Sequence, residues 1–484
     1  MNIHSLSPNS VWNYFDEITR IPRPSGKEEK IIAYLLDFAK KHNLSALKDD
    51  SGNVVIIKEA TKGYEHLPTV ILQSHTDMVA EKEASSSHNF ETDPINAYVD
   101  GDWVKARGTT LGADDGIGMA AQLAVLASDN VEHGKIEALF TCDEERGLTG
   151  AREMSANLLT GKYLINLDSE EEGEIYIGCA GGERTVATFN YRTEAPGEKA
   201  FFFEIIVSGL NGGHSGSDIH RGFGNALKII ARILHRLQKS CSLSLASIEG
   251  GNLLNAIPRD ARAVCAVPSP EKEKVRIELN LFLSDIEAEL ALTDPNIQIA
   301  LASCEKRELI DSQTALQLIK ALHALPNGVI GMSATMPQLV ETSTNLASIR
   351  MKAGNVIEIG TSQRSSVLSM KEYIVASVAH VFELAGAEVQ HGDSYPGWTP
   401  NPNSKLLAAA KERYKKLYNR ELKVNAIHAG LECGLILEKY PHLEMISCGP
   451  TLTDVHSPYE KLHIPSVKLW WNFLVEMLKN IPRE

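Results

Sequence analysis

The stretch Phe140–Gly150 reads FTCDEERGLTG and places three adjacent carboxylates directly after a run that is typical of a buried strand. Asp143, Glu144 and Glu145 would repel one another and raise one another's pKa at the end of a sheet. A cation or strong hydrogen-bond donors beside them would remove this cost. A positively charged partner is therefore expected at this position.

Other acids and imidazoles also follow apolar runs, in four further segments. They are His75 and Asp77 in TVILQSHTD, Asp114 and Asp115 in LGADDGIG, Asp168 in KYLINLD and His456 in GPTLTDVHSPYE. Imidazole and carboxylate ligands suit zinc, and paired metal ions about 3.5 to 4 Å apart are a known hydrolytic arrangement. Two metal ions that share a carboxylate would account for this supply, with one acid of the DEE run as a ligand and its neighbour free as a base.

Taken singly, these motifs have ordinary explanations, because a DEE run is most often a solvated loop and an HxD pair is weak. Their joint occurrence carries the interpretation. In an extended segment His75 and Asp77 point the same way, so Asp77 can orient the imidazole through its second nitrogen.

The strands and helices predicted around these residues indicate an α/β fold. Strands are expected at 53–57, 69–75, 135–142 and 162–168, with a helix over 116–127. Continuous apolar strands separated by helices indicate a mostly parallel sheet covered by helices. Such sheets place their sites at the carboxyl ends of the strands, where these residues lie.

The pattern changes near Gly182, where alternating strands and amphipathic helices begin. We expect an inserted α+β domain over 186–389. It could consist of two similar halves, although their amino-acid sequences show no visible repeat. The catalytic domain would then comprise 1–185 and 390–484.

Composition narrows the partners and the location. The chain has 484 residues, so two domains are expected, and a formal net charge of −14, which opposes binding to nucleic acid and to anionic membranes. No apolar run is long enough to span a bilayer, and the N-terminal residues lack the pattern of a signal peptide. Seven scattered cysteines fit reduced thiols. We therefore expect a cytoplasmic protein.

The motifs resemble a known family. SHTDMV, LGADDGIG, DEERGLTGA, NLDSEEEG and GPTLTDVHSP are similar to the five metal motifs of the dinuclear zinc aminoacylase and carboxypeptidase superfamily, and the similarity spans the chain. NGGHSGSDIHRG, NLLNAIPRDA and HAGLECG resemble its Xaa-His dipeptidase branch, the aminoacyl-histidine (carnosinase-like) dipeptidases.

The resemblance implies two zinc ions per chain, which cobalt or manganese can replace, and a role for each residue of the motifs. His75 and Asp168 would hold one ion, Glu145 and His456 the other, Asp115 would bridge them, Glu144 would be the general base and Asp77 would orient His75. Asp115 is preferred to Asp114 because the family's bridging acid is the fourth residue of its GxxD motif. A cis peptide bond is then expected between Asp115 and Gly116. The family's lysine two positions after the bridging acid is Ile117 here.

The inserted domain would be the family's lid. His214 would contact the scissile carbonyl, while Asn255, Arg364, Gly430 and Glu432 would line the substrate pocket. A glycine-rich turn would also explain His214, and a solvated loop would also explain Arg364. In dimeric relatives this histidine reaches the partner's active site. The insertion is long enough to replace the partner's lid, so a homodimer and a monomer both stay open.

The implied reaction is hydrolysis of Xaa-His dipeptides, including β-alanyl-histidine, by a bridging water that Glu144 activates. Two alternatives keep the same metal residues: an N-acyl amino acid hydrolase or tripeptidase, and a non-catalytic peptide-binding protein that depends on metal. The intact Glu144 argues against the second, because a binding protein needs no base.

Overall fold

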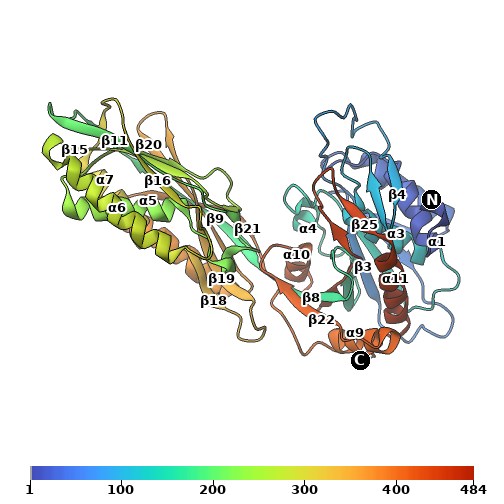
Figure 1. Cartoon of the computed structure of the whole chain (residues 1–484). Helices are drawn as coiled ribbons and strands as arrows, with labels where there is room; N and C mark the ends of the chain where they lie inside the picture. Colours follow the sequence, from blue (N-terminus) through green and yellow to red (C-terminus); the bar gives the residue numbers. More distant parts are fainter. Residues whose placement is uncertain (1–2, 484) are drawn as a thin grey trace. The chain divides into compact units, whose positions relative to one another are not determined.

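The computed structural model describes residues 3–483 and divides into two compact units (Figure 1). Unit 1 contains the chain up to Cys179, Trp398–Ala426 and Leu431–Glu484. Unit 2 contains Ala180–Gly397 and the short segment Ile427–Gly430. The second unit is thus inserted into the first along the sequence.

Unit 1 is built on an eight-stranded mixed sheet. In spatial order its strands are β1 (Ser45–Lys48), β2 (Val54–Lys58), β6 (Ile136–Thr141), β3 (Val70–His75), β7 (Tyr163–Asn166), β23 (Glu444–Ser447), β8 (Glu174–Cys179) and β22 (Lys423–Ile427). The four consecutive strands β6, β3, β7 and β23 are parallel, whereas β1, β2 and β8 pair antiparallel. The strands expected at 53–57, 69–75, 135–142 and 162–168 are β2, β3, β6 and β7.

The helices of unit 1 frame this sheet. They are α1 (Asn9–Thr19), α2 (Glu29–Lys41), α3 (Ala113–Ala127), α4 (Thr149–Glu153), α9 (Lys405–Tyr418), α10 (Glu432–Lys439) and α11 (Ile464–Lys479). Helix α3 packs between α1 and β3, and its side chains are buried on every face from Asp115 to Leu126. A helix that is apolar all round is typical of a core position. A smaller sheet adds β24 (Leu452–Thr453), β25 (Lys461–His463), β5 (Trp103–Ala106) and β4 (Ala97–Asp100).

Unit 2 carries an antiparallel sheet packed against helices. Its strands, in order, are β16 (Gln298–Ser303), β11 (Ala200–Ser208), β15 (Ala261–Pro268), β13 (Ser244–Gly250), β19 (Val340–Lys352), β20 (Val356–Ser365), β9 (Gly181–Asn190) and β21 (Glu388–Tyr395), with β18 (Gly328–Met332) beside β19. The helices are α5 (Ala226–Ser240), α6 (Lys272–Glu289), α7 (Ser312–Ala324) and α8 (Leu368–Leu384).

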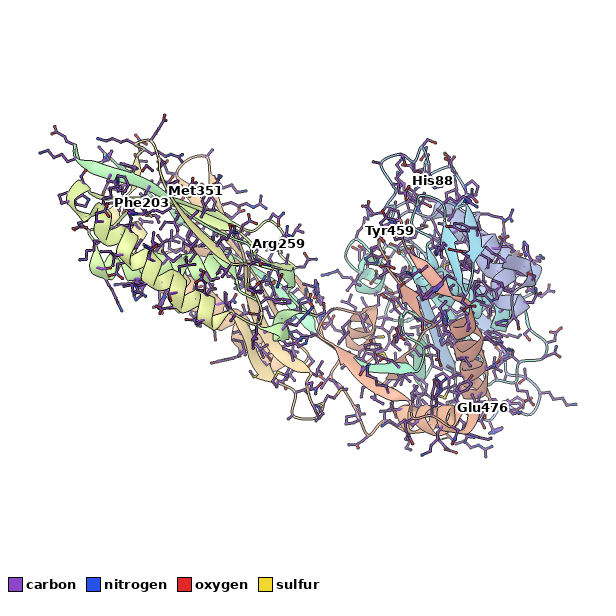
Figure 2. All side chains as sticks on the ribbon, viewed as in Figure 1. His88, Phe203, Arg259, Met351, Tyr459 and Glu476 are labelled. Carbon is purple, nitrogen blue, oxygen red and sulfur yellow. The ribbon has the colours of Figure 1, made fainter. Side chains whose placement is uncertain are left out.

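A single core joins that sheet to all four helices. Phe203 of β11, which is fully buried, belongs to it together with Phe282 of α6 and Phe382 of α8 (Figure 2). The pairing in the middle of the sheet is short, because β13 and β19 pair only at Gly250 and Ile349. Two short pairs complete the unit: β10 (Thr193–Glu194) with β17 (Leu309–Ile310), and β12 (Gly213–His214) with β14 (Ala256–Ile257).

The limits of the units differ from those expected at 185/186 and 389/390. Both expected limits fall inside strands, in β9 and β21, which hydrogen-bond to each other and belong whole to unit 2. The return of Ile427–Gly430 to unit 2 had no counterpart in the sequence analysis. Among residues 3–483, no helix is both long and apolar enough to cross a membrane.

Candidate functional site

The candidate metal ligands gather at one edge of the unit 1 sheet because its central strands are parallel and in register. His75 ends β3 opposite Thr141, which ends β6, and the loop after Thr141 carries Glu144 and Glu145. Asp168 follows β7, whose Asn166 pairs with Gln73. Carboxyl ends of neighbouring parallel strands therefore deliver these side chains to a common place.

Asp114 stands at the centre of this group. Its Oδ1 lies 3.0 Å from Nε2 of His75 and its Oδ2 lies 3.1 Å from Nε2 of His456. Each imidazole has a second carboxylate: Nε2 of His75 is 3.4 Å from Oδ1 of Asp168, and Nε2 of His456 is 3.1 Å from Oε2 of Glu145. One carboxylate thus separates two imidazole–carboxylate pairs, as a pair of metal ions with a shared ligand requires.

This arrangement corrects the assignment of the bridging position to Asp115. Asp115 turns away from the imidazoles, and its Oδ1 accepts a hydrogen bond from the backbone N–H of Gly118 at 3.0 Å. Neither residue has helical backbone angles (Asp114 φ −79°, ψ 111°; Asp115 φ −105°, ψ 39°), so the two side chains diverge. The cis peptide bond also lies one residue earlier than expected, between Asp114 and Asp115.

Asp77 connects His75 to the acidic loop. Its Oδ1 lies 3.4 Å from Nδ1 of His75, while its two oxygens accept the backbone N–H groups of Glu144 at 3.0 Å and Glu145 at 3.2 Å. Burial raises the pKa of Asp77, but the hydrogen bond and charge of His75 outweigh it and lower the pKa to about 2. Asp77 is therefore an ionised support for both the imidazole and the loop.

The carboxylates of the group carry more negative charge than their surroundings can solvate. Burial, with Asp168 and Glu432 nearby, raises the pKa of Glu144 well above its usual value although His75 opposes this. Burial raises the pKa of Asp168 to about 7. Burial raises the pKa of Asp114 as well, but hydrogen bonds from His456 and His75 outweigh it and the net pKa is lowered.

The imidazoles respond in the opposite sense. Hydrogen bonds to Asp114 and Glu145 raise the pKa of His456 to about 11. Burial lowers the pKa of His75, but the Asp168 charge and the Asp114 hydrogen bond raise it well above its usual value. The carboxylates around both imidazoles thus favour a positive charge at this place.

The donor set fits divalent metal ions. Donor atoms of His75, Asp114 and Glu145 lie within 4.8 Å of one another. Within residues 3–483, the buried Oε1 of Glu145 has no hydrogen-bond partner, which leaves a lone pair for a ligand bond. Two imidazoles with carboxylates suit zinc, and the oxygen-rich set also suits cobalt or manganese.

Glu432 is not placed where substrate would reach it. It lies in unit 1 with 1% of its surface exposed, and its Oε2 accepts hydrogen bonds from Nε2 of Gln73 at 2.6 Å and Oγ1 of Thr141 at 2.7 Å. Gln73 Oε1 in turn accepts from Nδ2 of Asn166 at 2.5 Å, and Asn166 accepts from Ser447. This chain of polar side chains crosses four strands beneath the ligand group, so we reassign Glu432 from substrate binding to support of the site.

This polar chain was not predicted from the sequence. Its signal was the presence of Gln73 within TVILQSH and of Asn166 within KYLINLD, two polar residues in otherwise buried strands. A polar side chain in such a strand needs a hydrogen-bond partner at the same depth. The sequence could not name that partner, since Glu432 is more than 350 residues away.

The other substrate-site residues belong to unit 2. His214 lies on β12 opposite Ala256 of β14, and the next N–H, of Ser215, bonds to the carbonyl of Asn255 at 2.7 Å. Nδ1 of His214 accepts the backbone N–H groups of Gly216 at 3.2 Å and Ser217 at 3.1 Å. The ring proton is then on Nε2, which makes that atom a hydrogen-bond donor.

Arg364 and Gly430 meet at the ring of Tyr395. Nη1 of Arg364, on β20, donates to the Tyr395 hydroxyl at 2.8 Å, and a Cβ on Gly430 would lie 2.9 Å from Cε2 of Tyr395. Beside them, Nε2 of His428 lies 2.7 Å from Oγ of Ser343. Burial and the Arg364 charge lower the pKa of His428 to about 3 and also lower the pKa of His214. Unit 2 therefore gathers one permanent cation and two neutral imidazoles.

Tyr459 is a further feature of the His456 loop. Tyr459 is 69% exposed in unit 1, three residues after His456 (Figure 2). The backbone of His456 itself is left-handed, with φ 59°. The loop therefore presents its imidazole from a tight turn, which no spacing rule in the sequence indicated.

Known proteins resemble this chain over most or all of its length. Residues 71–480 match Peptidase family M20/M25/M40. The chain is 43% identical over 482 residues to the Cytosol non-specific dipeptidase of Escherichia coli (strain K12), with 99% of each chain covered. The crystal structure of aminoacylhistidine dipeptidase from Vibrio alginolyticus matches with a TM-score of 0.95 and 41% identity, over 100% of this chain and 99% of that one.

A tripeptidase from Staphylococcus aureus shares the fold, with a TM-score of 0.57 at 17% identity over 98% of both chains. The family match covers most of the chain and includes all five motifs of the ligand group. The resemblance seen in the sequence is thus confirmed: this chain belongs to Peptidase family M20/M25/M40 and is a metallopeptidase.

Proposed function

We propose that this chain is a dipeptidase that hydrolyses Xaa-His dipeptides, including β-alanyl-histidine, with two zinc ions. His75 and Asp168 would hold one ion, His456 and Glu145 the other, and Asp114 would bridge them. The observation that carries the proposal is the Asp114 carboxylate between the two imidazoles, at 3.0 and 3.1 Å. The names of the Escherichia coli and Vibrio alginolyticus relatives support a dipeptide substrate, and the second supports a histidine at its carboxyl end.

The chemistry divides between the metal ions and Glu144. Zinc bound by this set would polarise the scissile carbonyl and lower the pKa of the attacking water. Glu144 accepts the proton of that water and passes it to the leaving amine. A carboxyl whose pKa is raised by burial suits this role, because it can hold the proton between the two transfers. Asp77 keeps His75 in orientation throughout.

Unit 2 would supply substrate binding and oxyanion stabilisation. His214 donates from Nε2 to the oxygen of the scissile carbonyl, a role for which its neutral ring is suited. Arg364 grips the free carboxylate of the dipeptide, since a guanidinium matches a carboxylate with two hydrogen bonds. Asn255 and Gly430 line the same pocket. A free carboxylate one residue beyond the scissile bond is what distinguishes a dipeptide from longer peptides.

An assay panel tests this function. Protein loaded with zinc, cobalt or manganese is offered β-alanyl-histidine, dipeptides without histidine, a tripeptide and an N-acetyl amino acid, with chelator-treated protein as control. We expect turnover of the dipeptides, fastest with histidine at the carboxyl end, and none after chelation. Preference for the N-acetyl amino acid or the tripeptide would favour those alternative activities, and binding without turnover would favour a peptide-binding protein.

The role of His214 is tested separately. His214→Ala removes one oxyanion donor, which costs about 100-fold to 1000-fold in kcat. Metal content should stay at the wild-type value, because His214 lies in unit 2 and every proposed ligand lies in unit 1. Unchanged kcat at saturating substrate would make His214 a structural residue of the β12 turn.

Two broader expectations belong to the same proposal. A cytoplasmic location is supported by the name of the Escherichia coli relative. A homodimer is proposed as the working assembly and is checked by light scattering of the purified chain, where the mass of a single chain would contradict it.

A further inference from the structure

The segment that carries Asp114 is held by a residue from the far end of the chain. Oε2 of Glu460 accepts the backbone N–H groups of Leu111 at 2.8 Å and Gly112 at 3.0 Å. Its Oε1 accepts those of Ala113 at 2.7 Å and Asp114 at 3.3 Å. Four successive amides thus converge on one carboxylate, which is 3% exposed.

These amides open helix α3, where backbone N–H groups have no partner within the helix. A local capping side chain would satisfy them. The cap position is Gly112, with φ 70°, and a Cβ there would lie 2.8 Å from both Nη2 of Arg23 and Sδ of Met78. A local side chain is therefore excluded, and the cap comes from a residue more than 340 positions away.

Arg23 holds the same segment through its carbonyl groups. Its Nη2 donates to the carbonyl of Gly112, and its Nη1 donates to those of Thr76 at 3.0 Å and Asp77 at 2.6 Å. The side chain is 1% exposed. Burial lowers the pKa of Arg23, and the charges of Asp77 and Glu460 oppose this shift. A buried cation is retained here because acids surround it and both of its terminal nitrogens donate to carbonyl groups.

The two residues connect the segments that carry His75, Asp114 and His456. Glu460 joins the loop of His456 to Asp114, and Arg23 joins the segment after His75 to Gly112. We propose that Glu460 and Arg23 are positioning residues, which hold Leu111–Asp114 so that the Asp114 carboxylate faces both imidazoles and can serve two metal ions. This inference rests on the proposed function for its consequence. The hydrogen bonds from Glu460 and Arg23 to Leu111–Asp114, called the clamp below, are themselves features of the structure.

Glu460→Gln tests the inference, because an amide keeps the size of the side chain but presents N–H groups to the amides of α3. We expect metal affinity to fall by about 10-fold to 100-fold, the usual range for residues that support metal ligands. Affinity is measured by competition with a chelator and metal analysis of the folded protein. At saturating zinc, kcat should recover most of its wild-type value with KM for the dipeptide unchanged, since the buried Glu460 carboxylate is occupied by four backbone N–H groups.

Glu137→Gln provides a matched control. Glu137 is 2% exposed and accepts the backbone N–H groups of Thr160 at 2.9 Å and Gly161 at 3.0 Å. It lies near the start of β6, at the opposite edge of the sheet from the ligand group. We expect this variant to lose stability while keeping wild-type metal affinity.

Hydrogen exchange of the metal-free protein reports the clamp independently. Glu460→Gln should increase exchange at Leu111–Asp114, whereas Glu137→Gln should not. The wild-type protein could bind no metal while exchange at Leu111–Asp114 still increases in Glu460→Gln and not in Glu137→Gln. In that case the proposed function fails, but the structural role of Glu460 stands.

Wild-type metal affinity in Glu460→Gln would overturn the positioning role, and so would an equal loss of affinity in Glu137→Gln. If Glu460→Gln does not fold, Glu460→Asp and Arg23→Lys replace it. Each replacement side chain keeps the charge but cannot reach all of the backbone groups that the original side chain binds. Wild-type metal affinity in both variants would likewise overturn the inference.

Discussion

At the scale of single residues, adjacent acids of the site make different contacts. Asp114 and Asp115 are adjacent and chemically identical, yet Asp114 faces His75 and His456 while Asp115 bonds to the N–H of Gly118. Glu144 and Glu145 differ in the same way, since Glu145 contacts His456 and Glu144 does not. Backbone direction, rather than side-chain type, separates these roles.

The division between Glu144 and Glu145 gives the first prediction. Glu144→Gln should keep the wild-type metal content and lower kcat by about 100-fold to 10,000-fold, because it removes the base and no proposed ligand. Glu145→Gln should lose metal as well as turnover. Metal analysis beside steady-state kinetics checks both variants. Loss of metal from Glu144→Gln would show that it is a ligand and not the base.

His428 gives a prediction for stability against pH. Its pKa is lowered to about 3 in the folded protein, mainly by burial, whereas an unfolded histidine titrates near 6.5. The unfolded state therefore binds a proton that the folded state rejects, and stability is lost as pH falls below about 6.5. The loss is about 1.4 kcal/mol per pH unit, or about 2 kcal/mol at pH 5.

Urea unfolding from pH 7.5 to pH 5 measures this dependence. His428→Gln should remove it. Ser343→Ala, which takes away the hydroxyl 2.7 Å from Nε2 of His428, should lower stability at every pH and keep the dependence. Identical pH profiles for wild type and His428→Gln would contradict the assignment.

At the scale of elements, short turns aim the functional side chains. The turn after β12 packs against the returning segment Ile427–Gly430, and the N–H groups of this turn at Gly216 and Ser217 hold the ring of His214. A Cβ on Gly216 would collide with the carbonyl oxygen of His428 and lie 3.0 Å from Cε1 of His214. The glycine is needed there for close approach of two backbones.

Gly216→Ala should therefore displace His214 and lower kcat by about 10-fold to 100-fold, as misplacement of a catalytic group by up to about 1 Å does. Metal content should not change. Gly197→Ala is the control in the same unit, since within residues 3–483 no atom lies within 4 Å of its added Cβ. Steady-state kinetics of the two variants test this prediction. Equal kcat values would show that the added methyl group at Gly216 does not disturb the function of His214.

At the scale of the whole molecule, the proposed metal ligands and the lid residues are divided between the two units. All five ligands, with Asp77 and Glu144, lie in unit 1, whereas His214, Asn255, Arg364 and Gly430 lie in unit 2. Unit 2 has a core of its own, which includes no proposed ligand. The proposed metal ligands and the proposed substrate-binding residues thus belong to different compact units.

Metal removal should consequently act on one unit. Zinc at 100 times its dissociation constant stabilises the state that binds it by about 2.7 kcal/mol. Chelation should therefore increase hydrogen exchange in the loops 111–116, 142–146 and 454–460 and leave β11, β15 and α5 unchanged. Mass spectrometry of the full chain with zinc and with chelator makes the comparison. Changes confined to unit 2 would refute the ligand assignment.

The sequence by itself determined much of the fold and the inventory of the site. Strands β2, β3, β6 and β7 were predicted because apolar runs of strand length are local signals, and an insertion was predicted from the change of pattern near Gly182. The parallel sheet then implied that residues after different strands would meet at one edge. The family followed from motifs that are each contiguous in the sequence.

The tertiary structure decided what depends on direction and on distant partners. Asp114 rather than Asp115 faces the imidazoles because a loop outside helical geometry aims it, and that loop is held by Glu460 and Arg23. Glu432 sits beneath the site because Gln73 and Thr141 bind it across the sheet. Local spacing cannot name these partners, since Glu460 lies 347 positions from Ala113, Glu432 lies 291 positions from Thr141 and Arg23 lies 89 positions from Gly112.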